Sequence, residues 1–304
     1  MVEQAPNSRR RWISFGTRLL LLLTVILAVA VGWKMIRLRS ERLIVAELRR
    51  LHAQVIYDYD RHGEPPPGPK LLRKILGDDA FAKVAYVDID DATDHALTLI
   101  GKLRNLNELG LASDKITDEG LANLARLNQL ETLRLRSASV TDAGLVHLKE
   151  LTGLKNLTLA GPQMTDAGLS QIARLPQLES LVIKTDKMTD SALGYIGKLS
   201  HLYSLSLGSS QISAVGLAQL TELKKLEHLY LWRATMTDSS LATIGKLTQL
   251  QSLGIADTRI ADAALVHLYG MSNLKLIRLV NTQTPSEDVE QLRHALPKCH
   301  VALN

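Results

Sequence analysis

The chain has 304 residues, a net charge of +5, few aromatic residues (4%) and a single cysteine, Cys299. One cysteine excludes an internal disulfide and a cysteine-rich metal site. The positive charge is concentrated in residues 1–81, which hold 14 of the 36 Lys and Arg but only 8 of the 31 Asp and Glu. The rest of the chain therefore lacks the basic excess of nucleic-acid-binding domains, and we expect no nucleic-acid partner.

The first predicted element is an apolar segment at residues 12–33, which follows a basic tail at residues 1–11. At ~1.5 Å per residue a helix of this length spans about 33 Å, enough for a ~30 Å hydrocarbon core. Trp12 and Trp33 stand at its ends, where interfacial aromatic anchors are common. A signal peptide cleaved after Ala30 is the alternative. Because the apolar run continues to Trp33, we expect an uncleaved single-pass signal-anchor helix.

The orientation of this helix is not decided by charge, because basic residues flank it on both sides. A short basic tail before a Leu-rich run resembles an export signal. We therefore expect the repeats described below to lie outside the cytoplasm.

Residues 34–81 are predicted to connect the anchor to the folded part of the chain. Apolar positions at helical spacing among basic residues predict a juxtamembrane helix over 34–56. Residues 55–60 alternate like a short strand, residues 61–70 are rich in Pro and Gly, and residues 71–81 predict a short helix that ends at Gly77. We expect this region to supply a linker and an N-terminal cap.

A strict internal repeat of 24 residues follows. Leu occupies the first position of eight successive units, and positions 4 and 6 of every unit are also apolar, which gives the motif L-x-x-L-x-L. The eight first-position residues are Leu106, Leu130, Leu154, Leu178, Leu202, Leu226, Leu250 and Leu274. A period in this range indicates a solenoid in which each unit has one short inward-facing strand.

A Thr–Asp pair also recurs in this frame, as at Thr141–Asp142. The six copies lie at residues 93, 117, 141, 165, 189 and 237, and the pair is altered at residues 213, 261 and 285. A catalytic pair would not be repeated, so we interpret Thr as a helix N-cap and Asp as a favourable charge at the helix N-terminus. Each unit is thus a strand, a turn and a short helix.

Residues 82–304 are therefore predicted to be an α/β solenoid of horseshoe shape, with a parallel sheet on the concave face and helices on the convex face. It would contain about eight regular repeats and a degenerate first one. In the first repeat the strand fits Val84, Val87 and Ile89, which leaves its turn two residues short.

The 24-residue frame with T-D-x-G-L resembles the leucine-rich-repeat superfamily, in the branch with a helical convex side. The basic tail, apolar segment and "PPPGPKLLRKILGDD" before the repeats resemble bacterial, planctomycete-type, membrane-anchored leucine-rich-repeat proteins. The resemblance implies protein binding and nothing catalytic. The Asn ladder common at position 9 of such repeats is absent, so the turns must be satisfied differently. That position holds Asp114, Ala138, Pro162, Asp186, Ser210, Ala234, Thr258 and Thr282.

No motif of a known enzyme, cofactor site or metal site occurs in the sequence. His147 and His267 occupy equivalent positions on repeat helices, which suits ordinary half-exposed residues. We therefore expect no enzyme, no cofactor and no small-molecule substrate.

The concave face is the candidate binding surface. Positions 3, 5, 7 and 8 of each unit are expected to point there, and most hold small residues, so that Gly208 and Gly254 would leave room for a partner. Two groups are larger, and we predict that both bind a protein partner. They are Arg134, Arg136 and Lys184, and His228, Tyr230, Trp232 and Arg233. The alternative is a structural or self-assembling cell-envelope protein.

Overall fold

The computed structural model describes residues 8–61, 63–261 and 264–303, without the side chains of residues 8–19, 30–31 and 34–37. The chain divides into two compact units, Met1–Glu47 and Leu48–Asn304. Each unit is described by itself. The division predicted from the sequence, into residues 1–11, 12–33, 34–81 and 82–304, stays a prediction.

The first unit consists of the greater part of one helix, α1 (Ser8–Arg50). Most of its apolar side chains are exposed, with Leu20 and Leu27 at 65% and 64% and Trp33 at 78%. Among the described residues, no helix is long and apolar enough to span a membrane. The predicted basic tail falls mainly outside the described residues, as does the side chain of Trp12. The juxtamembrane helix expected over 34–56 is part of α1 and ends at Arg50, since a strand begins at Gln54.

The second unit begins with a cap on the sheet. Strand β1 (Gln54–Tyr57) is antiparallel to β2 (Val84–Asp90), and between them lie α2 (Asp58–Arg61), α3 (Lys70–Leu76) and the 3-10 turn η1 (Asp78–Phe81). Gly77 ends α3 with φ of +89°, as predicted. The strand expected over 55–60 stops at Tyr57, because Asp58 turns the chain: its Oδ1 accepts hydrogen bonds from Tyr59 N at 3.0 Å and Lys83 N at 3.1 Å.

Eleven strands form one sheet in chain order, and all neighbours after the β1–β2 pair are parallel. Paired residues are 24 apart from β3 to β11, whereas Val87 of β2 pairs with Leu109 of β3, 22 residues on. The predicted short first turn is thus confirmed. The strands are β3 (Glu108–Ala112), β4 (Thr132–Arg136), β5 (Asn156–Ala160), β6 (Ser180–Lys184), β7 (Ser204–Gly208), β8 (His228–Trp232), β9 (Ser252–Ala256), β10 (Leu276–Val280) and β11 (His300–Leu303).

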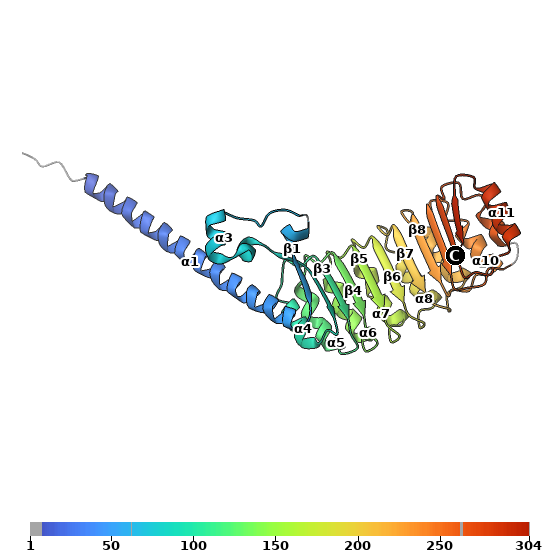
Figure 1. Cartoon of the computed structure of the whole chain (residues 1–304), viewed down its shortest axis with the longest axis horizontal. Coiled ribbons are helices and arrows are strands. Elements are labelled where there is room, and N and C mark those ends of the chain that lie inside the picture. The colour runs from blue at the N-terminus through green and yellow to red at the C-terminus, as the bar shows by residue number, and fades with distance from the viewer. Residues whose placement is uncertain (1–7, 62, 262–263, 304) are drawn as a thin grey trace, which may run out of the picture. The chain divides into compact units, whose positions relative to one another are not determined.

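In the second unit, short helices lie along one side of the sheet, and they connect the end of one strand to the start of the next (Figure 1). The first-position Leu residues lie between the two layers, and all eight are at most 2% exposed. The helical segments are α4 (Asp94–Ile100), α5 (Asp118–Leu121), η2 (Ala122–Arg126), α6 (Asp142–Leu145), η3 (Val146–Glu150), α7 (Asp166–Leu169), η4 (Ile172–Arg174), α8 (Asp190–Ile196), α9 (Ala214–Ala218), η5 (Gln219–Glu222), α10 (Asp238–Ile244), η6 (Ala264–Leu268) and α11 (Ser286–Ala295).

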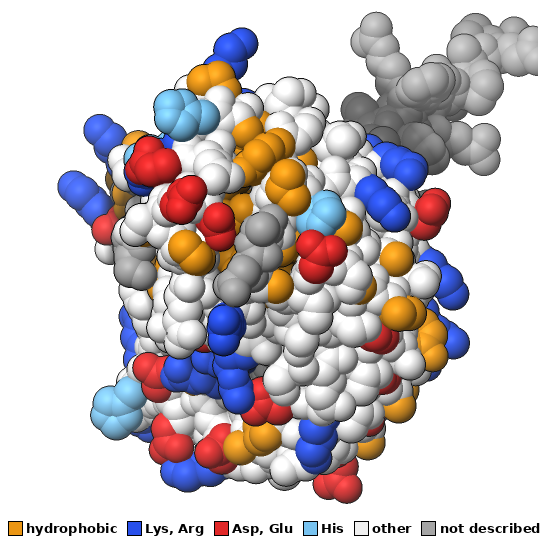
Figure 2. Space-filling view, turned by 90° about the vertical axis from the view of Figure 1, so that its right-hand side faces the viewer, with side chains coloured by type: hydrophobic (Ala, Val, Ile, Leu, Met, Phe, Trp, Pro, Cys, Tyr) orange, Lys and Arg blue, Asp and Glu red, His pale blue; other side chains and the backbone are white. Residues whose placement is uncertain are grey.

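The C-terminal end of this sheet carries a strand that the sequence frame did not count. Strand β11 pairs with β10 in the same register as the repeats, with Val301 opposite Ile277, and helix α11 lies between the two strands in the sequence. Leu303 is 47% exposed there. Figure 2 views the molecule from this end and shows hydrophobic side chains among charged ones.

After several strands a hydroxyl group at position 8 satisfies the turn in place of the missing Asn ladder. Thr185 Oγ1 donates to Met164 O at 2.9 Å and accepts from Lys187 N at 3.3 Å, while Ser209 Oγ donates to Met188 O at 2.6 Å. Ser137, Thr185 and Ser209 are at most 4% exposed. Position 8 therefore points into these repeats, and the expectation that it faces the concave side is wrong for them.

Candidate functional site

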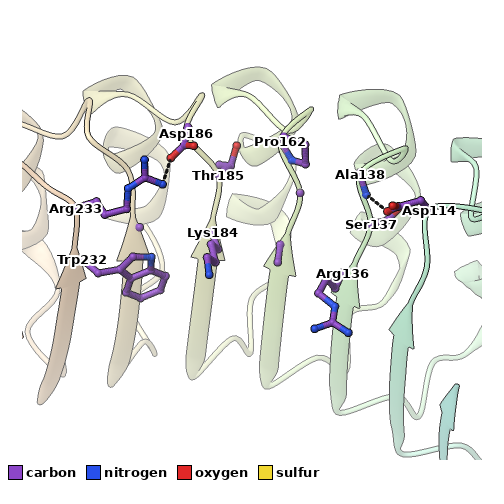
Figure 3. A pocket seen from close by; sticks show the side chains of 13 residues that line it. Asp114, Arg136, Ser137, Ala138, Pro162, Lys184, Thr185, Asp186, Trp232 and Arg233 are labelled. Atoms are coloured by element: carbon purple, nitrogen blue, oxygen red, sulfur yellow. Dashed lines mark hydrogen bonds and ion pairs between the residues drawn. The ribbon is translucent and has the colours of Figure 1, made fainter. Parts of the chain in front are cut away.

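A groove of about 350 Å³ lies at the carboxyl ends of strands β4 to β8 (Figure 3). Positions 7, 8 and 9 of consecutive repeats line it, because equal positions stack side by side in a sheet of constant register. The lining residues are Asp114, Arg136, Ser137, Ala138, Ala160, Gly161, Pro162, Lys184, Thr185, Asp186, Gly208, Trp232 and Arg233.

The side chain of Trp232 lies flat against Gly208 of the neighbouring strand. A Cβ atom on Gly208 would lie 1.9 Å from Trp232 Nε1, which no real side chain allows. The indole is therefore half-buried, and it occupies the space that Gly208 leaves. The expectation that this space admits a partner is wrong, since the contact instead fixes the ring as an end wall of the groove.

Tyr230 leans to the opposite side, toward β9. A Cβ on Gly254 would lie 2.4 Å from Tyr230 Cδ1, and the Tyr230 hydroxyl is 3.0 Å from Ser252 Oγ, so Gly254 also accommodates a ring from its own sheet. Tyr230 does not line the groove. The two aromatic residues of β8 thus belong to different neighbourhoods of the concave face.

Arg233 reaches the surface because of its backbone conformation. Its φ is +61°, in the left-handed region that L side chains rarely adopt, and Asp257 and Asn281 share this conformation at the same position of the next repeats. The left-handed residue is exposed, and in the Arg233 repeat the following residue, Ala234, is buried instead. Position 8 therefore faces outward in the last three repeats, and also in the first repeat, where Asp91 has a φ of +66° and is exposed.

The charges of the groove are unequally paired. Arg233 Nη1 lies 2.9 Å from Asp186 Oδ1, whereas Arg136 Nη2 lies 3.9 Å from Asp90 Oδ1. Asp114 Oδ1 accepts a hydrogen bond of 2.7 Å from Ala138 N. In the part of the chain that the structure describes, Lys184 has no acidic side chain within ion-pair distance. Two cations at the strand ends thus remain largely uncommitted.

Four of the seven predicted site residues meet in this groove: Arg136, Lys184, Trp232 and Arg233. Arg134 is exposed on the same strand as Arg136 but outside the lining, and His228 packs edge-on against Tyr203 with ring centroids 6.1 Å apart. Asp114 and Asp186 were not predicted as site residues. Their signal was present, since they are the acidic residues among the mostly small position 9 residues.

A second cavity of about 400 Å³ lies at the N-terminal cap, and it is lined in part by Asp58, Glu64, Glu108 and Glu131. Its carboxylates are mostly committed. Glu108 is ion-paired with Arg61, Glu131 Oε1 lies 3.1 Å from Lys155 Nζ, and Asp58 holds the turn after β1. No group of three or more His, Cys, Asp or Glu among the described residues could hold a metal ion. We therefore place the candidate site at the groove of β4 to β8.

The sequence matches no protein-family model and no curated protein. Among solved structures, an internalin (inlF) from Listeria monocytogenes is similar over 71% of this chain and 57% of its own, with a TM-score of 0.53 and 23% identity. An internalin C2 (inlC2) from the same species matches 74% of this chain and 82% of its own, with a TM-score of 0.42 and 21% identity. The chain spans little more than half of the first structure. Internalins are leucine-rich-repeat proteins, and the second unit has the α/β solenoid fold with a parallel sheet that such repeats form.

Proposed function

We propose that the chain is a non-catalytic recognition scaffold that binds a protein partner on the concave face of its sheet. The observation that carries the proposal is the groove whose end wall is Trp232, a half-buried aromatic residue held in place by Gly208. Buried or half-buried Trp and Arg residues around a depression have the composition of binding hot spots. The constant register of the solenoid makes this surface rigid, which lowers the entropic cost of binding.

The hydroxyl groups that line the groove favour binding over catalysis. Ser137 is 2% exposed and its Oγ accepts from Ser139 N at 3.2 Å, and Thr185 is 4% exposed with its hydroxyl committed to Met164 O. A nucleophile needs an accessible oxygen and a base within hydrogen-bond reach. These hydroxyls serve the turns of the solenoid instead, and the proposal therefore includes no reaction.

The test uses three forms of the full chain, namely wild type, Trp232→Ala and Tyr195→Ala, and compares which proteins each form captures. Tyr195 is an exposed aromatic residue of α8 and serves as the matched control. A partner of the concave face should bind wild type and Tyr195→Ala equally, and Trp232→Ala should weaken its binding by about 2 kcal/mol, roughly thirtyfold. If every captured protein binds Trp232→Ala as tightly as wild type, the concave-face proposal is wrong.

We further propose that α1 attaches the protein to a membrane, with the repeats outside the cytoplasm. The support is the band of exposed apolar side chains in α1, which water does not stabilise. They are Leu20, Leu21, Leu22, Leu23, Val25, Ile26, Leu27 and Val29. The narrower resemblance to planctomycete-type anchored proteins stays a prediction.

Membrane fractionation with an alkaline carbonate wash tests the attachment. A protein that the wash releases completely would contradict an embedded α1. Proteolysis of intact spheroplasts tests the orientation separately, because full protection of the repeats would place them in the cytoplasm.

A further inference from the structure

We propose that the groove of β4 to β8 is a subsite for one acidic side chain, Asp or Glu, of an extended segment of the partner protein. Its carboxylate would bind between Lys184 Nζ and the guanidinium of Arg136, beside the indole of Trp232. This inference rests on the proposed function and names the class of segment that the scaffold recognises.

Lys184 and Arg136 are available to a ligand. Arg233 is held by Asp186 at 2.9 Å, but Arg136 has only the contact of 3.9 Å with Asp90, in which the side chains are 76% and 89% exposed. Exposed ion pairs contribute ~0–1 kcal/mol, so Arg136 can leave Asp90 at little cost. Lys184 has no competing acid among the described residues. A carboxylate that enters the groove therefore meets two cations without first displacing a strong partner.

The positions of the two cations in the sheet also suit a single carboxylate. Arg136, Ala160, Lys184 and Gly208 are opposite one another in the register of β4 to β7, with Trp232 next in line on β8. Neighbouring strands are about 4.8 Å apart, so Arg136 and Lys184 start roughly 10 Å apart on either side of the small Ala160. Figure 3 shows Arg136 on β4 and Lys184 on β6, and rotation of these two long side chains would let both reach a carboxylate between the two strands. The indole then borders the same space from the far side.

The acidic residues of the groove favour an acidic peptide over a polyanion. Asp114 and Asp186 lie at the turn edge of the groove, at position 9, two positions after the cations of position 7. Their carboxylates would repel a nucleic-acid backbone, which carries a negative charge on every phosphate. A single carboxylate can still bind beside the cations, at the strand ends. The mixed charges therefore favour a peptide with one acidic anchor over a nucleic acid.

The experiment uses the full chain with Trp12→Phe and Trp33→Phe, so that Trp232 is the one remaining Trp of the three. Its fluorescence reports the groove directly. The probes are blocked peptides, namely hexaglutamine, the same peptide with one central Glu, and hexaglutamate, with inorganic phosphate and a single-stranded oligonucleotide as the other anions. We expect saturable changes with both Glu-containing peptides, weakened by added salt, and none with hexaglutamine.

Matched charge variants locate the contact. Lys184→Gln and Arg136→Gln should each weaken binding of the single-Glu peptide about tenfold, the scale of a hydrogen bond to a charged group. Arg126→Gln is the control, because Arg126 is an exposed cation of η2 that is outside the groove and not among the predicted site residues. Its effect should stay below about twofold, the scale of an exposed charge. Lys184→Arg should retain most of the affinity, since it keeps the cation.

Three outcomes overturn the subsite. An Arg126→Gln effect equal to that of Lys184→Gln would mean general surface attraction, and tighter binding of phosphate or the oligonucleotide would mean a polyanion site. No fluorescence change with either Glu-containing peptide would mean that the groove takes no acidic side chain. In the last case a protein that is captured by wild type and lost from Trp232→Ala would still support the proposed function, so the two failures are distinguishable.

Discussion

The carboxylate of Asp118 accepts two hydrogen bonds from Thr141 of the next repeat, one from the backbone N–H at 2.8 Å and one from the hydroxyl at 2.6 Å. The Thr141 hydroxyl oxygen in turn accepts from Ala143 N at 3.2 Å and caps helix α6. The same arrangement links Thr117 to Asp94, Thr165 to Asp142, Thr189 to Asp166 and Ser213 to Asp190. The Thr–Asp pair is thus both a helix cap, as predicted, and a ladder between repeats.

Asp118→Ala should destabilise the protein by about 1–3 kcal/mol, because the N–H and hydroxyl of Thr141 lose their acceptor. Asp238→Ala is the matched control. Asp238 also begins a helix, but the next repeat has Ala261 in place of Thr. The carboxylate of Asp238 instead lies 2.8 Å from Nε2 of the half-exposed His267. Urea unfolding of both variants decides between the accounts. Equal losses would mean that Asp acts through the helix dipole alone.

The Gly of T-D-x-G-L is explained by the same ladder. A Cβ on Gly168 would lie 2.3 Å from Asp142 Oδ1 and 2.9 Å from Asp142 Cα, whereas a Cβ on Gly194 of α8 would meet nothing within 4 Å. We expect Gly168→Ala to lower the unfolding midpoint. Gly194→Ala should raise the stability by roughly 0.5–1 kcal/mol, because Ala is the better helix former. Thermal unfolding measures both variants. A higher unfolding midpoint for Gly168→Ala would show that Asp142 can move away from the added Cβ without loss of stability.

Alkaline pH should weaken the N-terminal cap. Burial, and then the nearby Asp79 carboxylate, raise the pKa of Tyr57 to about 12, and its hydroxyl donates to Asp79 Oδ2 at 3.2 Å. A raised folded-state pKa means that the neutral phenol's contribution is complete below pH ~10, the unfolded value, and is lost as the pH rises toward about 12. Tyr57→Phe should therefore be less stable than wild type near neutrality, and the difference should shrink above pH ~10. A constant difference in unfolding midpoint would contradict this assignment.

Arg233 is predicted to carry backbone strain. Arg233→Gly and Arg233→Ala both remove the ion pair with Asp186, but only Ala keeps a Cβ at φ of +61°. The Gly variant should be the more stable by about 1 kcal/mol, the scale of the left-handed penalty. Lys184, which lies in strand β6, gives the control, because there Ala should be more stable than Gly. Denaturant unfolding of the four variants tests whether the difference in stability between Gly and Ala has opposite signs at positions 233 and 184.

The repeat frame was predictable because it depends on burial alone. A period of 24 with Leu at fixed positions leaves one way to bury every Leu, and the sheet register reproduces that period from β3 onward. The turns were less predictable, because position 8 has two conformations. Asp257 and Asn281 are residue types that tolerate positive φ, but Arg233 gives no such signal.

The frame predicts which residues lie beside the aromatic rings of β8, but it does not predict the strand toward which each ring leans. The register places Gly208 opposite Trp232 and Gly254 opposite Tyr230. From the sequence these glycines are expected to leave room for a partner, whereas in the structure each accommodates a ring of β8. The choice of neighbour depends on side-chain rotamers, because each ring could lean toward either adjacent strand. Sequence spacing does not determine that choice.

Gly208 and Gly254 should respond differently to the addition of a Cβ atom. Gly208→Ala should push the indole of Trp232 off β7, since a Cβ would lie 1.9 Å from Nε1 and 2.1 Å from Cε2. The ring can rotate outward, so the protein should still fold while the groove loses its end wall.

Gly254→Ala is the matched control. Its Cβ would lie 2.4 Å from Tyr230 Cδ1 and should displace Tyr230 in the same way, but outside the groove. In the chain with Trp12 and Trp33 replaced by Phe, Gly208→Ala should shift the emission of Trp232 to longer wavelength and weaken binding of the single-Glu peptide, because the ring becomes more exposed and less fixed. Gly254→Ala should leave both nearly unchanged. Unchanged emission in Gly208→Ala would mean that the ring does not rest on Gly208, and equal losses of binding in the two variants would mean that the concave face responds as a whole rather than at this groove.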